Sequence, residues 1–189
     1  MKIFQIGFNR CATTALHVFF KKNGLISIHW ADRWLARWIH QNHQRGCRLL
    51  DGCDSFQFYS DMEDAPHLYA HILYYKQLDQ QYPGSKFILN IRSKDKWLLS
   101  RLRFGRYCEE FAVAHGLSVS QTVALWAQQW DEHIIDVLQY FKSRPNLLVF
   151  NIDKHDIGYL VSFFPELKLE VKDYWEIKSA TVKRNNIEE

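Results

Sequence analysis

The sequence lacks the cysteine spacings of zinc centres and disulfide frameworks and the long apolar runs of membrane spans. Its four cysteines form no CxxC pair and no cysteine/histidine spacing typical of a zinc site; they are Cys11, Cys47, Cys53 and Cys108. No run of 18 apolar residues occurs, and no hydrophobic leader follows Met1. We therefore expect reduced thiols, no bound metal, no integral membrane segment and a cytoplasmic location.

Excess charge of one sign is also missing. The formal net charge is +3 with the nine histidines neutral, which is too small to predict a nucleic-acid or anionic-membrane partner. Hydrophobic residues make up 47% and charged residues 24% of 189 residues, as in one ordinary globular domain spanning 1–189. Aromatic residues are abundant, with 13 Phe, 9 Tyr and 7 Trp. Such a surplus predicts that some rings line a ligand cleft or a partner surface.

Hydrophobic periodicity predicts strands that alternate with helices. Strands are expected at 2–6, 25–30, 56–59, 86–91 and 147–152, and helices at 14–23, 31–41, 66–81, 94–105, 118–141 and 157–164. The alternation indicates an α/β fold with three layers, a mainly parallel sheet flanked by helices, and a ligand cleft at the carboxyl ends of the strands. Residues 1–105 would form a nucleotide-binding core, and 118–189 a long helix, the last strand and a tail.

The turn between the first strand and the first helix is the most informative segment. It runs from Gly7 to Thr14, where consecutive backbone N–H groups and the positive end of a helix dipole form an anion cradle. Nucleoside-triphosphate loops read GxxxxGK[ST], whose lysine reaches the β- and γ-phosphates. Here Ala12 replaces the second glycine and Thr13 the lysine, so the pattern predicts anion binding but argues against a kinase or ATPase.

This turn resembles the 5′-phosphosulfate loop of sulfotransferases that use 3′-phosphoadenosine 5′-phosphosulfate (PAPS), which has the form P-K-x-G-T-T. Arg10 stands at the lysine of that pattern, and Thr13 and Thr14 match its paired threonines. Asn9 and Ala12 depart from its proline and glycine. An arginine in place of lysine keeps the charge but presents a planar fork instead of a compact ammonium.

A second match follows the strand expected at 86–91. In the same family an arginine after a later strand and a serine eight residues on hold the 3′-phosphate, and Arg92 and Ser100 have that spacing. The resemblance implies a P-loop NTPase-like fold and a PAPS cofactor bound without metal, with adenosine 3′,5′-bisphosphate as product. It also implies cofactor contacts from Asn9, Arg10, Cys11, Ala12, Thr13, Thr14, Arg92 and Ser100.

Transfer of a sulfuryl group needs a cation for the leaving phosphate and a base for the acceptor. Arg10 is the candidate cation. His29, at the end of the second expected strand, is the first candidate for the base, and Asp32 and Asp61 are two others. The structural alternatives are a hydrogen-bonded strand end for His29, a helix cap for Asp32 and a turn for Asp61.

These features predict a sulfotransferase that modifies a hydroxyl or amine of a small molecule, a sugar or a lipid. A small-molecule kinase with a P-loop and a non-catalytic nucleotide-binding module remain as alternatives. The glycine-rich C-terminal nucleotide motif of animal cytosolic sulfotransferases is absent from the sequence. Three basic residues of the tail are candidates to replace it: Lys178, Lys183 and Arg184.

Overall fold

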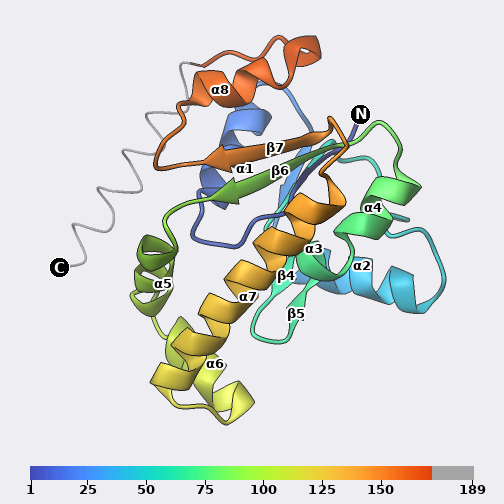
Figure 1. Cartoon of the computed structure of the whole chain (residues 1–189). Coiled ribbons are helices and arrows are strands. Elements are labelled where there is room, and N and C mark those ends of the chain that lie inside the picture. Colours follow the sequence, from blue (N-terminus) through green and yellow to red (C-terminus); the bar gives the residue numbers. More distant parts are fainter. Residues whose placement is uncertain (172–189) are drawn as a thin grey trace.

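A computed structural model describes residues 1–171 and shows a five-stranded sheet with the order β2-β3-β1-β6-β7 (Figure 1). Every neighbouring pair of strands in it is parallel. The strands are β1 (Ile3–Gln5), β2 (Ser27–His29), β3 (Phe58–Ser60), β6 (Lys86–Ile91) and β7 (Leu147–Asn151). The predicted α/β class is confirmed. Because β3 lies between β1 and β2, the opening strand–helix–strand unit does not pair its own two strands.

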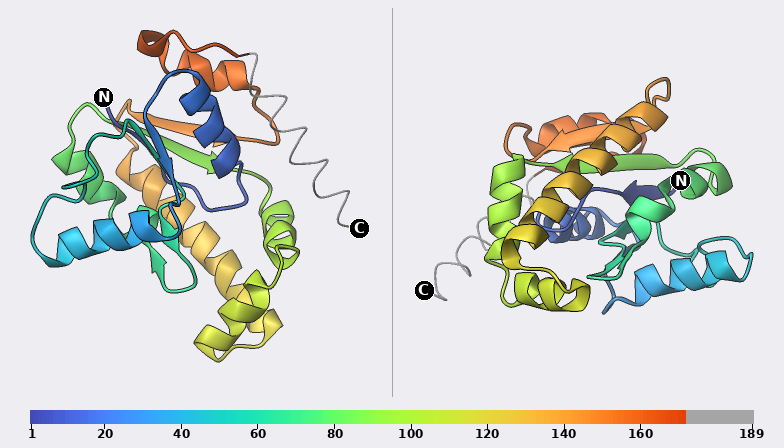
Figure 2. Two further views of the ribbon diagram at one scale, coloured as in Figure 1. Left: turned by 180° about the vertical axis from the view of Figure 1, so that it is seen from behind. Right: turned by 60° about the horizontal axis from the view of Figure 1, so that its bottom comes forward.

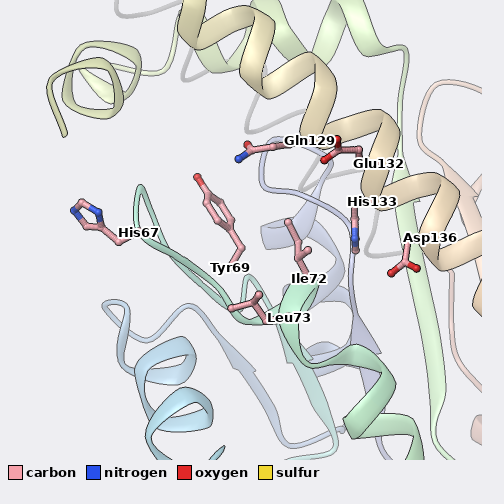
Figure 3. A pocket seen from close by; sticks show the side chains of 8 residues that line it. All are labelled: His67, Tyr69, Ile72, Leu73, Gln129, Glu132, His133 and Asp136. Atoms are coloured by element: carbon pink, nitrogen blue, oxygen red, sulfur yellow. The ribbon is translucent and has the colours of Figure 1, made fainter. Parts of the chain in front are cut away.

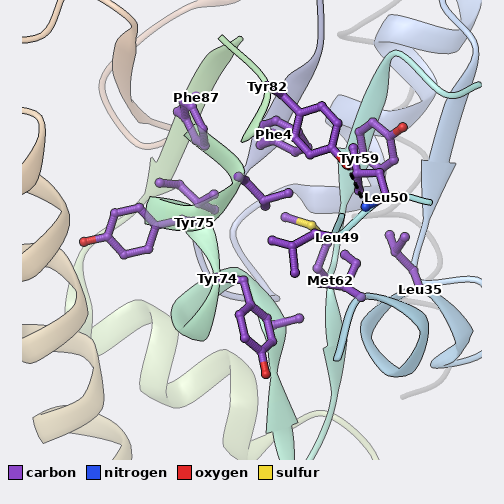
Figure 4. Packing of buried hydrophobic residues seen from close by; sticks show 14 of the residues in the cluster. Phe4, Leu35, Leu49, Leu50, Tyr59, Met62, Tyr74, Tyr75, Tyr82 and Phe87 are labelled. Atoms are coloured by element: carbon purple, nitrogen blue, oxygen red, sulfur yellow. Dashed lines mark hydrogen bonds between the residues drawn. The ribbon is translucent and has the colours of Figure 1, made fainter. Parts of the chain in front are cut away.

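Helices cover both faces of the sheet, which confirms the three predicted layers (Figures 1 and 2). One face packs against α1 (Thr13–Lys22) and α8 (Ile157–Ser162), and the other against α2 (Trp34–Gln44), α3 (Ala70–Leu73), α4 (Tyr75–Gln81) and α7 (Val119–Tyr140). Side chains alternate between the two faces of each strand, so each face has its own hydrophobic core. Phe4 and Phe87 belong to the core under α2, α3, α4 and α7, shown in Figure 4. None of the helices within residues 1–171 has the length and hydrophobicity to cross a bilayer.

A third core, built mainly from aromatic rings, lies beside the carboxyl ends of the strands. It joins Phe8 to α5 (Lys94–Leu102), α6 (Tyr107–His115) and the first half of α7. Trp97 and Trp126 are completely buried in it. Much of the aromatic surplus is therefore packed interior and does not line a cleft.

Two expected helices begin later than predicted. Residues 66–81 do not form one helix, because Pro66 lies in the turn of an antiparallel hairpin of β4 (Glu63–Asp64) and β5 (Leu68–Tyr69), and α3 and α4 follow it. The helix expected at 31–41 starts at Trp34, since residues 30–33 all have positive φ, between 51° and 69°. The helix α6 and a short 3₁₀ turn, η1 (Pro165–Leu167), were not predicted.

The side chain of Asn90, on β6, fixes the loop that follows β1. Its Nδ2 donates to the carbonyl of Cys11 at 2.6 Å, and its Oδ1 accepts from the backbone N–H of Gly7 at 3.1 Å and from Gln5 Nε2. The Oε1 of Gln5 in turn accepts from the backbone N–H of Asp61 at 3.0 Å. Asn90 and Gln5 are completely buried, so these bonds form without competition from water. Both ends of the loop are thus held from outside the loop.

We expect Gly7→Ala to destabilise the protein by about 1–3 kcal/mol, because a methyl group at Gly7 would overlap the carbonyl and side chain of Asn90. Urea unfolding of the purified variant measures the loss. Gly158→Ala in α8 is the control, since a methyl group there meets only the Asp156 side chain and alanine favours a helix. An unfolding midpoint for Gly7→Ala equal to that of the wild type would show that the loop is not held this tightly.

Candidate functional site

The loop between β1 and α1 has the geometry of an anion cradle. Arg10 and Ala12 both have φ of 64°, which curls the backbone immediately before α1. Ala12 caps the helix without a side-chain hydrogen bond, and the first turn contains no acidic residue. The first turn of α1 thus has neither a capping side chain nor a carboxylate of its own. Thr13 is buried and Thr14 exposed at this same turn, so Thr14 is the threonine that a ligand can reach directly.

Three residues predicted from separate segments meet beside this loop. Arg92 Nη1 donates to the carbonyl of Arg10 at 3.2 Å, and Arg10 Nε donates to Ser100 Oγ at 3.1 Å. The guanidinium of Arg10 also lies over the ring of Phe104, 4.2 Å from its centroid. The structure therefore gathers Arg10, Arg92 and Ser100 into one cluster at the carboxyl end of the sheet.

Positive charge exceeds negative charge in this cluster. Burial lowers the pKa of Arg10, and electrostatic repulsion from the Arg92 guanidinium lowers it further. One carboxylate, that of Asp153, lies near Arg92 Nη2 at 3.9 Å and Lys96 Nζ at 3.4 Å. The Nε of Arg92 is buried and has no hydrogen-bond partner among the described residues. A phosphate or sulfate fits this environment because it supplies both the missing charge and the missing acceptor.

Two of the three candidate bases lie against the loop. His29 Nε2 is 3.2 Å from Thr14 Oγ1 and 3.6 Å from Asp61 Oδ2. Its Nδ1 is 3.0 Å from Ser60 Oγ, which itself donates to the carbonyl of Ile28. Since that hydroxyl proton is engaged, His29 Nδ1–H donates to Ser60 and Nε2 accepts from Thr14. His29 is therefore both a hydrogen-bonded strand end and a neighbour of the cradle.

Asp32 is placed differently. It is exposed in the left-handed turn before α2, and the residue that caps α2 is Arg33, which makes no capping side-chain bond. The structure thus places Asp32 neither at a helix cap nor in the cluster of Thr14, His29 and Asp61.

Protonation separates the two remaining candidates. Burial, with a smaller contribution from His17, lowers the pKa of His29 to about 4, so its imidazole is neutral at pH 7. Burial raises the pKa of Asp61, against the opposing charges of Arg101 and Arg10. Because the imidazole is neutral, the contact between His29 and Asp61 is not an ion pair at pH 7. A general base works best when its pKa is near the working pH, which favours Asp61 over His29.

A buried network behind the loop was missed by the sequence analysis. Asn9 Nδ2 donates to Glu63 Oε1, and Arg101 Nε donates to Asn9 Oδ1 at 3.1 Å. Arg101 is completely buried and also donates to the Tyr107 hydroxyl at 2.7 Å. The departure of Asn9 from the proline of the family pattern therefore has a structural role. Burial, and then the charge of Asp61, raises the pKa of Glu63, so these two carboxyl groups share one electrostatic environment.

A signal for part of this network was present in the sequence. Asn90 is a polar residue inside the otherwise apolar strand KFILNI, and a buried polar side chain needs partners. Arg101 gave no such signal, because it stands among the basic residues of α5, where an arginine is usually solvated. The basic residues of the tail, Lys178, Lys183 and Arg184, lie outside the described residues.

Comparison with known proteins agrees with this arrangement. A family model described as a sulfotransferase domain matches residues 2–144, which include the cradle, His29, Asp61 and the pair of Arg92 and Ser100. No curated protein matches the chain significantly. With a match over most of its length, the chain belongs to the sulfotransferase domain family.

Proposed function

We propose that this sulfotransferase takes its sulfuryl group from PAPS. The observation that carries the proposal is the convergence of Arg10, Arg92 and Ser100 beside the loop, with the buried Nε of Arg92 left without a partner. The loop and the first turn of α1 would hold the 5′-phosphosulfate through backbone N–H groups and through Thr13 and Thr14. Arg92 and Ser100 would hold the 3′-phosphate. The proposal requires no metal ion.

Bound PAPS supplies a sulfuryl group that is activated by its anhydride bond to phosphate. In the transfer, the acceptor oxygen or nitrogen forms a bond to sulfur while the bond from sulfur to the phosphate oxygen breaks, and that oxygen keeps the electron pair. Arg10 is placed to stabilise the charge that develops on the leaving phosphate. Its stacking on Phe104 and its bond to Ser100 restrict the guanidinium before the ligand arrives.

We assign the role of acceptor base to Asp61, which differs from the first expectation of His29. The Asp61 side chain is 16% exposed, so an acceptor can reach it, while its Oδ1 has no hydrogen-bond partner in residues 1–171. Ionised Asp61 would take the proton that the acceptor loses. His29 would orient the Thr14 hydroxyl through the lone pair of its Nε2, as a positioning residue.

The acceptor is proposed to be a small molecule, a sugar or a lipid that carries a hydroxyl or an amine. A cytoplasmic location remains an expectation from the sequence. The kinase and the non-catalytic module make different predictions in the experiments below, since the first needs ATP with magnesium and the second shows no turnover.

We expect adenosine 3′,5′-bisphosphate to raise the melting temperature without magnesium, because cationic side chains, backbone N–H groups and hydroxyls would form both phosphate sites. At 100 times its dissociation constant the ligand stabilises the protein by about 2.7 kcal/mol. Arg92→Ala should weaken binding about 10- to 150-fold in calorimetry, which corresponds to roughly 1.5–3 kcal/mol for a hydrogen bond to a charged group.

Arg45→Ala is the matched control for this loss, since Arg45 is exposed at the end of α2 and should leave the affinity unchanged. A thermal shift that requires ATP and magnesium would contradict the PAPS proposal. Equal affinity of the Arg92 variant and the wild type would remove Arg92 from the site.

Arg10→Ala should lower turnover more than it lowers the affinity for adenosine 3′,5′-bisphosphate. The reason is that only an interaction that is stronger in the transition state than in the ground state accelerates the reaction. Steady-state kinetics with PAPS and the best acceptor from a panel of alcohols and amines measures turnover, and calorimetry measures affinity. Equal losses in both quantities would reduce Arg10 to a binding residue.

Asp61→Asn should lower turnover by about 10²- to 10⁴-fold while adenosine 3′,5′-bisphosphate still binds, because an amide cannot accept the proton. In the wild type, turnover should rise with pH as Asp61 ionises. Its raised pKa places this rise above the value near 4 that is typical of a free aspartate. If His29→Ala or Asp32→Asn abolishes turnover and Asp61→Asn does not, the base is one of those residues instead.

A further inference from the structure

A cavity of about 380 Å³ lies between β5, α3 and α7, and Phe8 packs against two of its lining residues, Tyr69 and His133. Figure 3 shows side chains from the hairpin and α3 facing side chains from α7 across it. Ile72 and Leu73 form an apolar wall, and Tyr69 adds a ring. Its volume suits a small organic molecule. Neither the binding of PAPS nor the assignment of Asp61 uses this cavity.

His133, on α7, lines this cavity and has an unused hydrogen-bond acceptor. Its side chain is 3% exposed, and its Nε2 lies 2.6 Å from the carbonyl of Ile6. Because a carbonyl only accepts, Nε2 carries the proton and Nδ1 carries a lone pair. That Nδ1 is buried and has no partner among the described residues. Burial lowers the pKa of His133, so the imidazole stays neutral and the lone pair stays available.

Two more residues of α7 add acceptors. Gln129 Oε1 is buried without a partner in the described part of the chain. The carboxylate of Glu132 accepts one bond from Gln128 Nε2 at 2.7 Å, and no lysine or arginine of residues 1–171 pairs with it. A buried acceptor without a donor costs free energy, which a ligand with N–H groups would recover.

The charge of the cavity is negative. Asp136 is compensated, because Lys76 Nζ and the Tyr75 hydroxyl each donate to it at 2.7 Å. Glu132 therefore contributes the uncompensated charge of the lining. An apolar wall opposite one free carboxylate and two unused neutral acceptors matches a molecule with an apolar body and a protonated amine.

We propose that this cavity binds a small organic ammonium ion, with its N–H groups directed to Glu132, Gln129 and His133 and its carbon skeleton against Ile72 and Leu73. The cavity shares a wall with the loop, because Phe8 meets His133 edge to face at 5.3 Å and Tyr69 at 6.4 Å. The proposal rests on the cavity itself and does not depend on PAPS as the donor.

Three probes with the same ring and different head groups test the proposal: cyclohexylammonium, cyclohexanol and cyclohexanecarboxylate. Ligand-observed NMR titrations at pH 7 with the nucleotide-free full chain give their affinities. We expect cyclohexylammonium to bind most tightly and cyclohexanecarboxylate most weakly. Equal affinities, a preference for the carboxylate, or no detectable binding of cyclohexylammonium would overturn the proposal.

Two variants locate the binding. Glu132→Gln should weaken cyclohexylammonium about fivefold, as expected for loss of a partly exposed ion pair, and should leave cyclohexanol unchanged. Gln129→Met keeps the side-chain length and should weaken the ammonium about five- to tenfold. Glu110→Gln on α6 is the control, because Glu110 is an exposed carboxylate outside the cavity.

Melting temperatures establish that the variants fold. Wild-type affinity in both Glu132→Gln and Gln129→Met would place the ammonium elsewhere and overturn the assignment. A parallel titration with adenosine 3′,5′-bisphosphate keeps this result separate from the proposed function. Failure of cyclohexylammonium to bind the wild type, with intact nucleotide binding, refutes the cavity proposal alone, and the reverse result refutes PAPS alone.

Discussion

The buried amide of Asn90 is the interaction on which the site depends. It binds the first N–H and a late carbonyl of the loop at once, and it reaches Asp61 through Gln5. Hydrogen bonds from Asn90 therefore fix the position of the cradle backbone. Through Gln5 they also fix the segment that carries the proposed base. Because this support comes from outside the loop, the residues within the loop can differ from the family pattern while the cradle keeps its geometry.

Charge is arranged around this support in two zones. On the α5 side, Arg10 and Arg92 face the loop with too few carboxylates to neutralise them, which favours a ligand that carries several negative charges. On the β3 side, Asp61 and Glu63 are carboxyl groups that burial makes hard to ionise. Arg101 lies behind both zones, completely buried among aromatic rings, and opposes the rise in the pKa of both acids. The proposed site would thus bind an anion on one side and exchange a proton on the other.

The sequence predicted those parts of the structure that depend on local pattern. The strand at 86–91 was placed residue for residue because KFILNI is apolar and bounded by a turn, and the spacing of Arg92 and Ser100 identified a pair that does meet Arg10. The features that the sequence did not predict depend on contacts between residues that are far apart in the chain. Pro66 gave the signal of a helix start but lies in a hairpin turn. The choice between His29 and Asp61 turns on desolvation, which a sequence does not display, and the burial of Arg101 arises only when α5, α6 and α7 pack together.

The placement of the four thiols determines where a covalent probe can be attached. Burial raises the pKa of both Cys11 and Cys53 to about 12, and Cys108 is also buried, so these thiols are shielded and hardly ionised at neutral pH. Cys47 is exposed just beyond the end of α2. A maleimide dye or spin label would therefore react at one position without prior removal of the other cysteines, and the thiol of Cys11 in the loop between β1 and α1 would stay unmodified. Cys47 therefore provides a single labelling site for spectroscopy in the unmodified sequence.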